Sequence, residues 1–465
     1  MLPVLALVGR PNVGKSTLFN QLTGSRDALV ADFPGLTRDR RYGFGNFEGN
    51  SFIVIDTGGL GDSTEELDSL AASQAQIAMD EADYVVFVVD HRDGLTPADQ
   101  KIAEHLRRSN KLVAIAVNKS EGLSSELAEA EFYDLGLGSP VSIAALHGHR
   151  ISSLMQKVLS PVISDAATDK TDSGIESNNG PHLAVIGRPN VGKSTLINRL
   201  IGANRLVTSS TPGTTRDSIL VPCKRGDSEF VLVDTAGIRR KAKVSESIEK
   251  FSIVQSLKAI ENSGVVIFLI DAREGVTEQD LSLIGLIIQR GRALTIGVNK
   301  WDGIDASHRR RIEGEVDRKL EFAGFARVNY ISALHGSGID SVISSALTTY
   351  SMAGRDFSTP RLNQILEQAL EAHQPPLVGG RRIRLRYVHQ GGRHPQIFIV
   401  HGNRTERLPD HYRRYLLNTF RKTLNLEGVP IQLNLKSGDN PYAGRRNVLT
   451  RRQLKRRRRI IRHGR

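Results

Sequence analysis

The chain has 465 residues, a formal net charge of +13 and a single cysteine, Cys223. At roughly 100 to 200 residues per domain, this length predicts about three domains. One cysteine excludes an intramolecular disulfide framework and is typical of a protein in a reducing compartment. No stretch of the sequence has the roughly 18 consecutive apolar residues that a membrane-spanning helix needs. The apolar residues 2–8 are interpreted as a first strand and not as a secretion signal.

The excess positive charge lies entirely in the C-terminal quarter. Residues 1–354 contain 38 Lys+Arg against 43 Asp+Glu, residues 355–444 contain 14 against 7, and residues 445–465 contain 11 against none. The regional charges are therefore −5, +7 and +11, which add to +13. This asymmetry predicts a polyanionic partner for the C-terminal end of the chain.

The sequence repeats itself at a long, fixed interval. GRPNVGKSTLFNQL at residues 9–22 returns as GRPNVGKSTLINRL at residues 187–200, an offset of 178 residues. An interval this long exceeds the roughly 20 to 50 residues of solenoid repeats, so each copy is expected to be a domain with its own core. The same offset relates two further pairs of motifs: TRD at residues 37–39 and 215–217, and DTGG at 56–59 with DTAG at 234–237.

Apolar runs within each copy predict strands, and the segments between them have helical spacing. Residues 51–55, 84–89 and 264–270 have the continuous apolar character of strands buried on both faces. We therefore predict two α/β domains, each a mostly parallel sheet with helices on both faces. The expected organisation is a first domain at residues 1–160, a flexible polar linker at 161–180, a second domain at 181–354, a small α+β domain at 355–440 and a basic tail at 441–465.

Each copy carries GxxxxGK[ST] directly after an apolar strand, which is the pattern of a phosphate-binding P-loop. The loop amides and the N-terminus of the following helix are expected to bind phosphate. Lys15 and Lys193 are expected to neutralise the β and γ phosphates, and Ser16 and Ser194 to bind Mg²⁺. The predicted nucleotide-binding residues are Gly9, Arg10, Pro11, Asn12, Val13, Gly14, Lys15 and Ser16, with Gly187, Arg188, Pro189, Asn190, Val191, Gly192, Lys193 and Ser194 in the second copy.

A second group of motifs is expected to respond to the γ phosphate. The DxxG aspartate, Asp56 or Asp234, can reach the Mg²⁺ shell. Thr37 and Thr215 lie where a switch loop closes, and each hydroxyl can complete that shell only when the γ phosphate is present; an ordinary turn threonine is the alternative. Catalytic roles are predicted for Lys15, Thr37, Asp56, Lys193, Thr215 and Asp234, and nucleotide contacts also for Thr57, Gly58, Gly59, Leu60, Thr235, Ala236, Gly237 and Ile238.

The NKxD motif predicts selectivity for guanine, because its carboxylate accepts two hydrogen bonds that adenine cannot donate. The second copy has the full motif, whereas the first has a glutamate, longer by one methylene. A further base-contacting motif, [ST]-A-x, begins with Ser332 in the second copy and Ala144 in the first. We therefore expect altered affinity at the first site without loss of binding. The predicted residues are Asn118, Lys119, Ser120 and Glu121, and Asn299, Lys300, Trp301 and Asp302.

Neither copy has the glutamine that many GTPases place after DxxG to orient the attacking water. Leu60 and Ile238 occupy those positions. Asn12 and Asn190, inside the P-loops, are the best local candidates to bind a monovalent cation beside the phosphates, and stabilisation of the loop is their alternative role.

The C-terminal quarter predicts the order helix, strand, strand, helix, strand. The expected ranges are 359–372, 383–388, 396–400, 409–424 and 429–435. This order suits a KH-like α+β layer. No GxxG occurs in the predicted domain, so the backbone clamp that KH domains use for RNA is absent.

Basic side chains are nevertheless frequent in this quarter. Alternation along a strand places Arg382, Arg384 and Arg386 on one face, for which an ordinary solvated face is the alternative. The basic run at 455–459 predicts phosphate binding with strong salt dependence, with anionic lipid or solubility as alternatives. The other basic residues of the group are Arg381, Arg413, Arg414, Arg421 and Lys422.

Together, the paired GRPNVGKSTL loops, GLTRD with GTTRD, DTGG with DTAG, and the NKWD box resemble the Der (EngA) family of double Era-like GTPases over nearly the whole chain. The resemblance implies two GTPase domains, a KH-like domain, GTP/GDP and Mg²⁺ as ligands, and K⁺-stimulated hydrolysis. It also implies a role in maturing the large ribosomal subunit of bacteria. We further expect a cytoplasmic monomer that contacts ribosomal RNA through its C-terminal domain and basic tail. An RNA-binding scaffold with structural nucleotides, or an NTP-driven RNA-remodelling enzyme, remain as alternatives.

Overall fold

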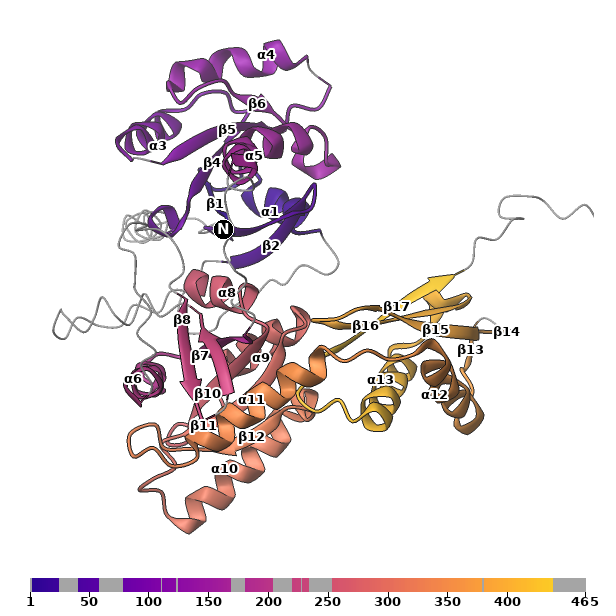
Figure 1. Cartoon of the computed structure of the whole chain (residues 1–465). Helices are drawn as coiled ribbons and strands as arrows, with labels where there is room; N and C mark the ends of the chain where they lie inside the picture. Colours follow the sequence, from indigo (N-terminus) through magenta and orange to yellow (C-terminus); the bar gives the residue numbers. More distant parts are fainter. Residues whose placement is uncertain are drawn as a thin grey trace, which may run out of the picture. The chain divides into compact units, whose positions relative to one another are not determined.

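The chain forms two units, one large and one small (Figure 1). The large unit contains Met1–Arg355 and Leu426–Pro430, and the small unit contains Asp356–Asn425 and Ile431–Arg465. No helix among the described residues is long and apolar enough to cross a membrane. The computed structural model describes residues 2–24, 41–57, 78–109, 111–122, 124–168, 180–203, 220–226, 228–233, 253–378 and 380–437.

Six strands form the sheet of the first domain, in the order β2-β3-β1-β4-β5-β6. Strand β2 is antiparallel to β3, and all other neighbouring pairs are parallel. The structure thus confirms a mostly parallel α/β domain. The strands are β1 (Val4–Val8), β2 (Arg41–Phe47), β3 (Asn50–Asp56), β4 (Tyr84–Asp90), β5 (Leu112–Asn118) and β6 (Val141–Ser142).

Helices cover both faces of this sheet, which explains the continuous apolar character of its central strands. Leu5 and Leu7 of β1 pack on one side with Phe19 of helix α1 and Leu154 of helix α5. The intervening Ala6 packs on the other side of the sheet, in the same core cluster as Ala103 and Leu106 of α3. The helices are α1 (Lys15–Thr23), α3 (Pro97–Arg108), α4 (Ser125–Glu129) and α5 (Ile151–Thr168).

The second domain repeats this topology, with the strand order β8-β9-β7-β10-β11-β12 and β8 antiparallel to β9. The duplication seen in the sequence is therefore a duplication of the fold. Its strands are β7 (His182–Gly187), β8 (Val221–Arg225), β9 (Ser228–Leu232), β10 (Val265–Asp271), β11 (Ala293–Asn299) and β12 (Arg327–Tyr330). Its helices are α6 (Lys193–Ala203), α8 (Ile253–Glu261), α9 (Glu278–Gln289), α10 (Ala306–Lys319) and α11 (Ile339–Ala353).

The linker prediction at residues 161–180 is wrong for its first part. Helix α5 continues to Thr168, so residues 161–168 are helical. The polar composition suggested a linker, but Ala166 and Ala167 have the highest helix propensity and no glycine interrupts the chain before Gly174. Polarity alone does not end a helix.

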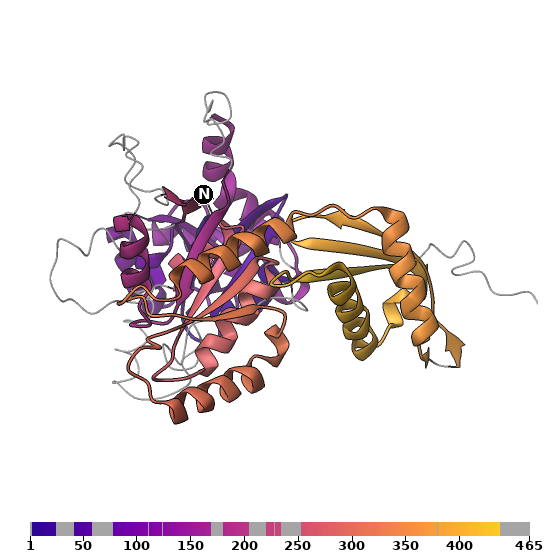
Figure 2. The same ribbon diagram turned by 60° about the horizontal axis from the view of Figure 1, so that its bottom comes forward.

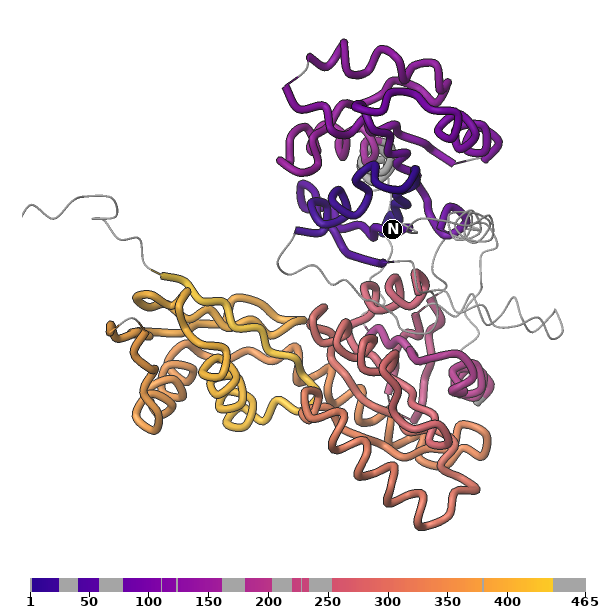
Figure 3. Tube along the Cα trace, turned by 180° about the vertical axis from the view of Figure 1, so that it is seen from behind, coloured from indigo at the N-terminus to yellow at the C-terminus, as the bar shows by residue number. Residues whose placement is uncertain are grey.

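The main sheet of the small unit has three strands, in the order β15-β16-β17. Both long helices lie on the same side of this sheet, which gives two layers (Figures 2 and 3). The predicted order of helix, strand, strand, helix and strand is confirmed, and two short strands are added. In the sheet, β15 is antiparallel to β16 and β16 is parallel to β17. The elements are α12 (Thr359–Ala372), β13 (Leu377–Val378), β14 (Arg381–Arg382), β15 (Arg384–Gly392), β16 (Gln396–Asn403), α13 (Asp410–Leu424) and β17 (Ile431–Ser437).

The prediction that Arg382, Arg384 and Arg386 share one strand face is wrong. Arg382 belongs to β14, which pairs with β13 and not with the main sheet. The register between β15 and β16 shifts between Leu385 and Tyr387, so Arg386 lies in a bulge. A bulge adds one residue to a strand and breaks the alternation that the prediction assumed.

Residues 426–430 lie in the large unit although they connect α13 to β17. The amide of Gly428 donates to the Phe325 carbonyl at 2.6 Å, and the Leu294 amide donates to the Gly428 carbonyl at 2.8 Å. This docking explains why β17 begins at Ile431, two residues later than predicted.

Candidate nucleotide-binding sites

Each P-loop needs glycine just before its helix. Gly14 has φ +96° and Gly192 has φ +97°, in the left-handed region that disfavours other residues. A Cβ atom on Gly14 would lie 2.3 Å from Nδ2 of Asn118, and one on Gly192 would lie 2.2 Å from Nδ2 of Asn299. The backbone thus approaches the NKxD motif too closely for any side chain.

The P-loop lysines are held against their own loops. Nζ of Lys15 donates to the carbonyls of Gly9 at 2.9 Å and Arg10 at 2.7 Å, and Nζ of Lys193 donates to the Arg188 carbonyl at 2.6 Å. Burial lowers the pKa of Lys15, while nearby Asp56 opposes this effect. The Lys15 side chain therefore folds back onto the first phosphate loop.

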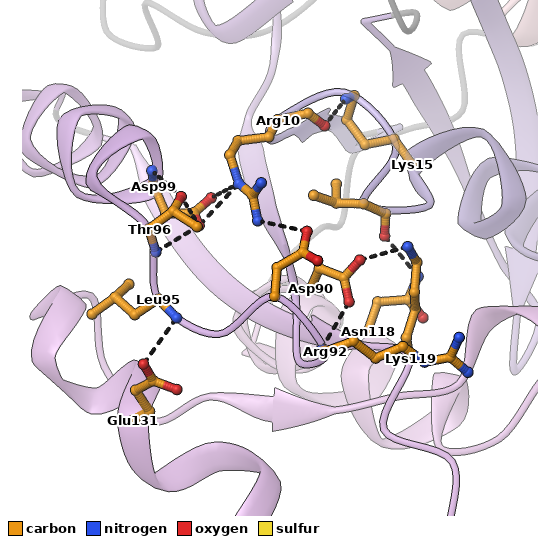
Figure 4. A network of polar contacts seen from close by, with 12 residues as sticks. Arg10, Lys15, Asp90, Arg92, Leu95, Thr96, Asp99, Asn118, Lys119 and Glu131 are labelled. Atoms are coloured by element: carbon orange, nitrogen blue, oxygen red, sulfur yellow. Dashed lines mark hydrogen bonds and ion pairs between the residues drawn. The ribbon is translucent and has the colours of Figure 1, made fainter.

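The side chain of Arg10 ties the P-loop to the start of α3 (Figure 4). Its Nε lies 3.0 Å from both carboxylate oxygens of Asp99, and its Nη2 lies 3.3 Å from Asp93. Asp99 is fully buried and also caps α3 through the amide and hydroxyl of Thr96. The predicted nucleotide residue Arg10 therefore also has a structural role, and Arg188 repeats it with Asp280.

Two asparagines join the phosphate loop to the base-binding loops. Nδ2 of Asn118 donates to the Val13 carbonyl at 2.8 Å, while its Oδ1 accepts from the Ala145 amide at 2.9 Å. In the second domain, Asn299 makes the same pair of bonds with Val191 at 2.7 Å and Ala333 at 2.8 Å. Both asparagines are buried, so these bonds fix three loops at each site.

The lysines of both NKxD motifs have left-handed backbone conformations, with φ +61° at Lys119 and +63° at Lys300. Nζ of Lys119 lies 2.5 Å from Oδ2 of Asp90, and Nζ of Lys300 lies 2.5 Å from Oδ2 of Asp271. These ion pairs hold the long lysine stems across the place where the base is expected to lie.

The carboxylates predicted to bind the base have different neighbours in the two sites. A hydrogen bond from Ser332 lowers the pKa of Asp302, and Nε2 of His335 lies 3.2 Å from its Oδ2. In the first site, Glu121 lies 3.3 Å from Nη2 of Arg92. Ala144 stands where the second site has Ser332, so it cannot supply a hydroxyl to this carboxylate.

The donors expected to bind Mg²⁺ fit that ion. Asp56 ends β3 with its side chain fully buried, and Ser16 lies in the first turn of α1. Both offer hard oxygen atoms, which Mg²⁺ prefers, and this ion keeps waters and phosphate oxygens in its shell rather than needing an all-protein cage.

The remaining predicted site residues make few contacts with other site residues or lie outside the described part of the chain. The Thr57 hydroxyl donates to the Leu7 carbonyl at 2.9 Å, which leaves its backbone for any nucleotide contact. Asn12 and Asn190 are exposed, with φ +64° and +62°, a conformation that asparagine tolerates well. Thr37, Thr215, residues 58–60 and residues 234–238 lie outside the described residues.

Sequence analysis missed the acidic partners that organise both sites. Asp90 and Asp271 hold the NKxD lysines, and Asp99 and Asp280 hold the P-loop arginines. A signal was present, since both pairs are separated by 181 residues, as are Asn118 and Asn299. A residue-by-residue comparison of the two copies would have found them.

Comparison with known proteins agrees with the geometry. A family model described as a 50S ribosome-binding GTPase matches residues 4–119 and 182–300, and one described as the C-terminal KH-domain-like domain of EngA bacterial GTPase enzymes matches residues 357–436. A protein named GTPase Der from Thioalkalivibrio sulfidiphilus is 54% identical over 465 residues, covering 100% of this chain and 99% of its own. GTPase Der from Legionella pneumophila strain Lens is 49% identical over 462 residues, covering 99% of each.

Proposed function

The chain belongs to the Der family of GTPases, and from this we propose that it couples GTP hydrolysis to assembly or maturation of the large ribosomal subunit. One observation carries the proposal: the family model that matches both nucleotide-binding domains is described as a 50S ribosome-binding GTPase. The net positive charge of residues 355–465 supports it, because ribosomal RNA is a polyanion.

In this proposal, the P-loop amides bind the phosphates, and Lys15 and Lys193 neutralise the β and γ oxygens. Ser16 and Ser194 would hold Mg²⁺, and Thr37, Asp56, Thr215 and Asp234 would supply further oxygen ligands at the two sites. Mg²⁺ supplies charge neutralisation of the transferred phosphoryl group. Asp302 accepts hydrogen bonds from guanine N1 and N2 at the second site, and Glu121 does so at the first.

Two side chains place the nucleotide without touching the reacting atoms. Asn118 and Asn299 bond both to the phosphate loop and to the loop beneath the base, so the distance between the phosphate and base subsites is fixed. Such preorganisation supports hydrolysis, because phosphoryl transfer depends mainly on positioning and electrostatics.

We propose that a monovalent cation takes part in hydrolysis at both sites. Neither DxxG motif is followed by the neutral glutamine that orients water in many GTPases, so charge compensation in the transition state has to come from another group. Asn12 and Asn190 offer exposed amide oxygens within the P-loops, and K⁺ is the ion that we assign to them.

The nucleotide state of each site is proposed to shift the chain between forms that differ in affinity for ribosomal RNA. A bound nucleotide can act as a switch only if it binds the two forms unequally. If the chain were instead an RNA-binding scaffold with structural nucleotides, its affinity for RNA would be the same whichever nucleotide is bound. An NTP-driven RNA-remodelling enzyme would instead show RNA-dependent rearrangement of the RNA itself.

The central experiment measures GTP turnover of Lys15→Ala and Lys193→Ala separately, in potassium and in sodium buffer. Loss of one charge-stabilising group is expected to slow the affected site about 100-fold or more. Sedimentation of the wild-type chain with ribosomal particles, in GDP or a non-hydrolysable GTP analogue, then tests the switch. Equal sedimentation in both nucleotides, without turnover at either wild-type site, would refute it.

A further inference from the structure

Among the described residues of the small unit, helices cover one face of the three-stranded sheet and leave the other face open. Helices α12 and α13 lie on the same side of the sheet (Figure 3). On that side, Phe398 of β16 contacts Phe420 of α13, with ring centroids 5.1 Å apart. Phe398 and Val400 are fully buried, whereas the alternating Ile399 and His401 are partly exposed. Antiparallel and mixed sheets commonly leave one face to solvent in this way.

Three rings gather on the open face. The rings of Tyr387 and His401 are stacked with centroids 4.4 Å apart and planes 4° apart, and the ring of His389 lies 5.1 Å from that of His401. Tyr387 is 46% exposed although it is large and partly apolar. Cross-strand pairing of Tyr387 with His401 holds the first two rings in place.

The charge around these rings is positive. Register places Lys436 of β17 beside His401, and Arg384 of β15 opposite Asn403, so both basic residues share the open face. None of the residues in β15, β16 or β17 is Asp or Glu. At the end of the sheet, the Glu406 carboxylate accepts a hydrogen bond from the Ser437 hydroxyl of β17.

The register also places Asn434 of β17 beside Ile399, on the same face. We propose that this open face, formed by Arg384, Tyr387, His389, His401, Asn434 and Lys436, binds unpaired bases of single-stranded RNA. The proposal rests on the RNA partner proposed above and assigns a place to it. Bases stack on the Tyr387, His389 and His401 rings, as they do on exposed aromatic side chains of other RNA-binding sheets. Arg384 and Lys436 pair with the flanking phosphates.

Unpaired RNA is a better match for this face than a duplex or a protein. In a duplex, the base faces are hidden within the helix, so the rings would have nothing to stack against. A protein partner would be expected to bury a larger apolar surface, whereas this face combines rings with amides and basic groups. The absence of GxxG from the predicted KH-like domain means that RNA needs a contact other than the usual backbone clamp.

The test uses the full chain and fluorescence anisotropy with three labelled RNAs of equal length: a single strand, its duplex and an abasic strand. The basic tail is expected to bind all three through phosphate, so the informative quantity is the preference for the single strand. Wild-type protein should prefer it over the abasic strand by at least tenfold, since each stacked base contributes about one order of magnitude in affinity. Tyr387→Ala combined with His401→Ala should abolish that preference.

Three further variants make the result specific. Tyr387→Phe should retain the preference, because it keeps the ring. Tyr133→Ala is the matched control, since Tyr133 is 53% exposed but lies in the first domain, in the 3₁₀ helix Ala130–Leu135. Arg384→Gln with Lys436→Gln should lower the slope of log affinity against log salt by about 0.7 per lost phosphate contact.

The outcomes separate this inference from the proposed function. If wild-type protein binds none of the RNAs, the RNA partner itself is wrong. If it binds RNA but the double variant keeps its preference for the single strand, the RNA partner survives and this face is not the site. Circular dichroism and GTP turnover of each variant, expected to match wild type, confirm that the fold is intact.

Discussion

The Nε atom of Arg10 lies 3.0 Å from both carboxylate oxygens of Asp99, 89 residues farther along the chain. Arg188 and Asp280 repeat this contact at 3.0 and 3.1 Å in the second domain. In both domains the aspartate also forms a capping box with a threonine at the start of a helix. One buried carboxylate therefore fixes both the P-loop and the helix beside it.

Replacing Arg188 with alanine is expected to destabilise the second domain by roughly 2 kcal/mol. Loss of one partner from a buried ion pair costs about 3 to 5 kcal/mol, and the partial exposure of Arg188 reduces this figure. The freed P-loop should also bind nucleotide about tenfold more weakly, which a fluorescent GDP analogue would measure in the Lys15→Ala background.

The control for this prediction is Lys224→Ala, which breaks an exposed ion pair with Glu229 in the same domain. Exposed pairs contribute only about 0.2 to 1 kcal/mol, so its melting temperature and nucleotide affinity should remain close to wild type. Equal effects of Arg188→Ala and Lys224→Ala would show that the contact with Asp280 does not position the P-loop.

Much of the fold was predictable because the motifs are local and occur twice. A glycine-rich loop between an apolar strand and a helix defines a P-loop within about 20 residues of sequence. The contacts of Arg10 with Asp99 and of Lys119 with Asp90 were not predictable from spacing, because folding brings together residues from different loops. The bulge at Arg386 was also missed, since alternation along a strand assumes an unbroken register.

Restoring the usual motif to the first site should sharpen its recognition of guanine. Glu121→Asp combined with Ala144→Ser recreates the carboxylate and hydroxyl that Asp302 and Ser332 provide in the second site. We expect the ratio of GDP to IDP affinity to rise about tenfold, because IDP lacks the 2-amino group and a hydrogen bond to a charged acceptor contributes about 1.5 kcal/mol or more.

The measurement is made in the Lys193→Ala background, where the second site is weakened. Glu121→Asp alone should give a smaller gain, since Ala144 provides no hydroxyl to orient the shorter carboxylate. An unchanged ratio in the double variant would mean that the extra methylene of Glu121 and the missing hydroxyl at Ala144 do not weaken recognition of guanine.

The affinity of the second site for nucleotide should fall at low pH. In Ser332→Ala, this fall should begin at a higher pH. The hydrogen bond from Ser332 lowers the pKa of Asp302, so the carboxylate stays ionised, and able to accept from guanine, to a lower pH than an ordinary aspartate. Without the hydroxyl, the pKa rises and binding is lost sooner as the pH falls. The check is a pH series of GDP affinity in the Lys15→Ala background, with circular dichroism to exclude unfolding; coincident curves would contradict the prediction.

Gly428→Ala is expected to destabilise the large unit by about 3 kcal/mol. Gly428 has φ +72°, a conformation that costs other residues about 1 to 2 kcal/mol, and its Cβ would lie 2.4 Å from Cγ2 of buried Thr349. Gly226→Ala separates the two causes, because Gly226 has φ +58° and open space around it, so only the backbone cost of about 1 kcal/mol applies.

Hydrogen exchange locates the effect. The amides of Leu294 and Gly428 close the two bonds that dock residues 426–430, so both should exchange faster in Gly428→Ala and remain protected in Gly226→Ala. Adding Thr349→Ala removes the two side-chain atoms that lie nearest to the new methyl group. Only the Leu294 carbonyl, 2.9 Å from the new Cβ, then remains in close contact with it, so part of the protection should return. Unchanged exchange at both amides in Gly428→Ala would show that this loop tolerates a side chain and that its docking does not depend on glycine.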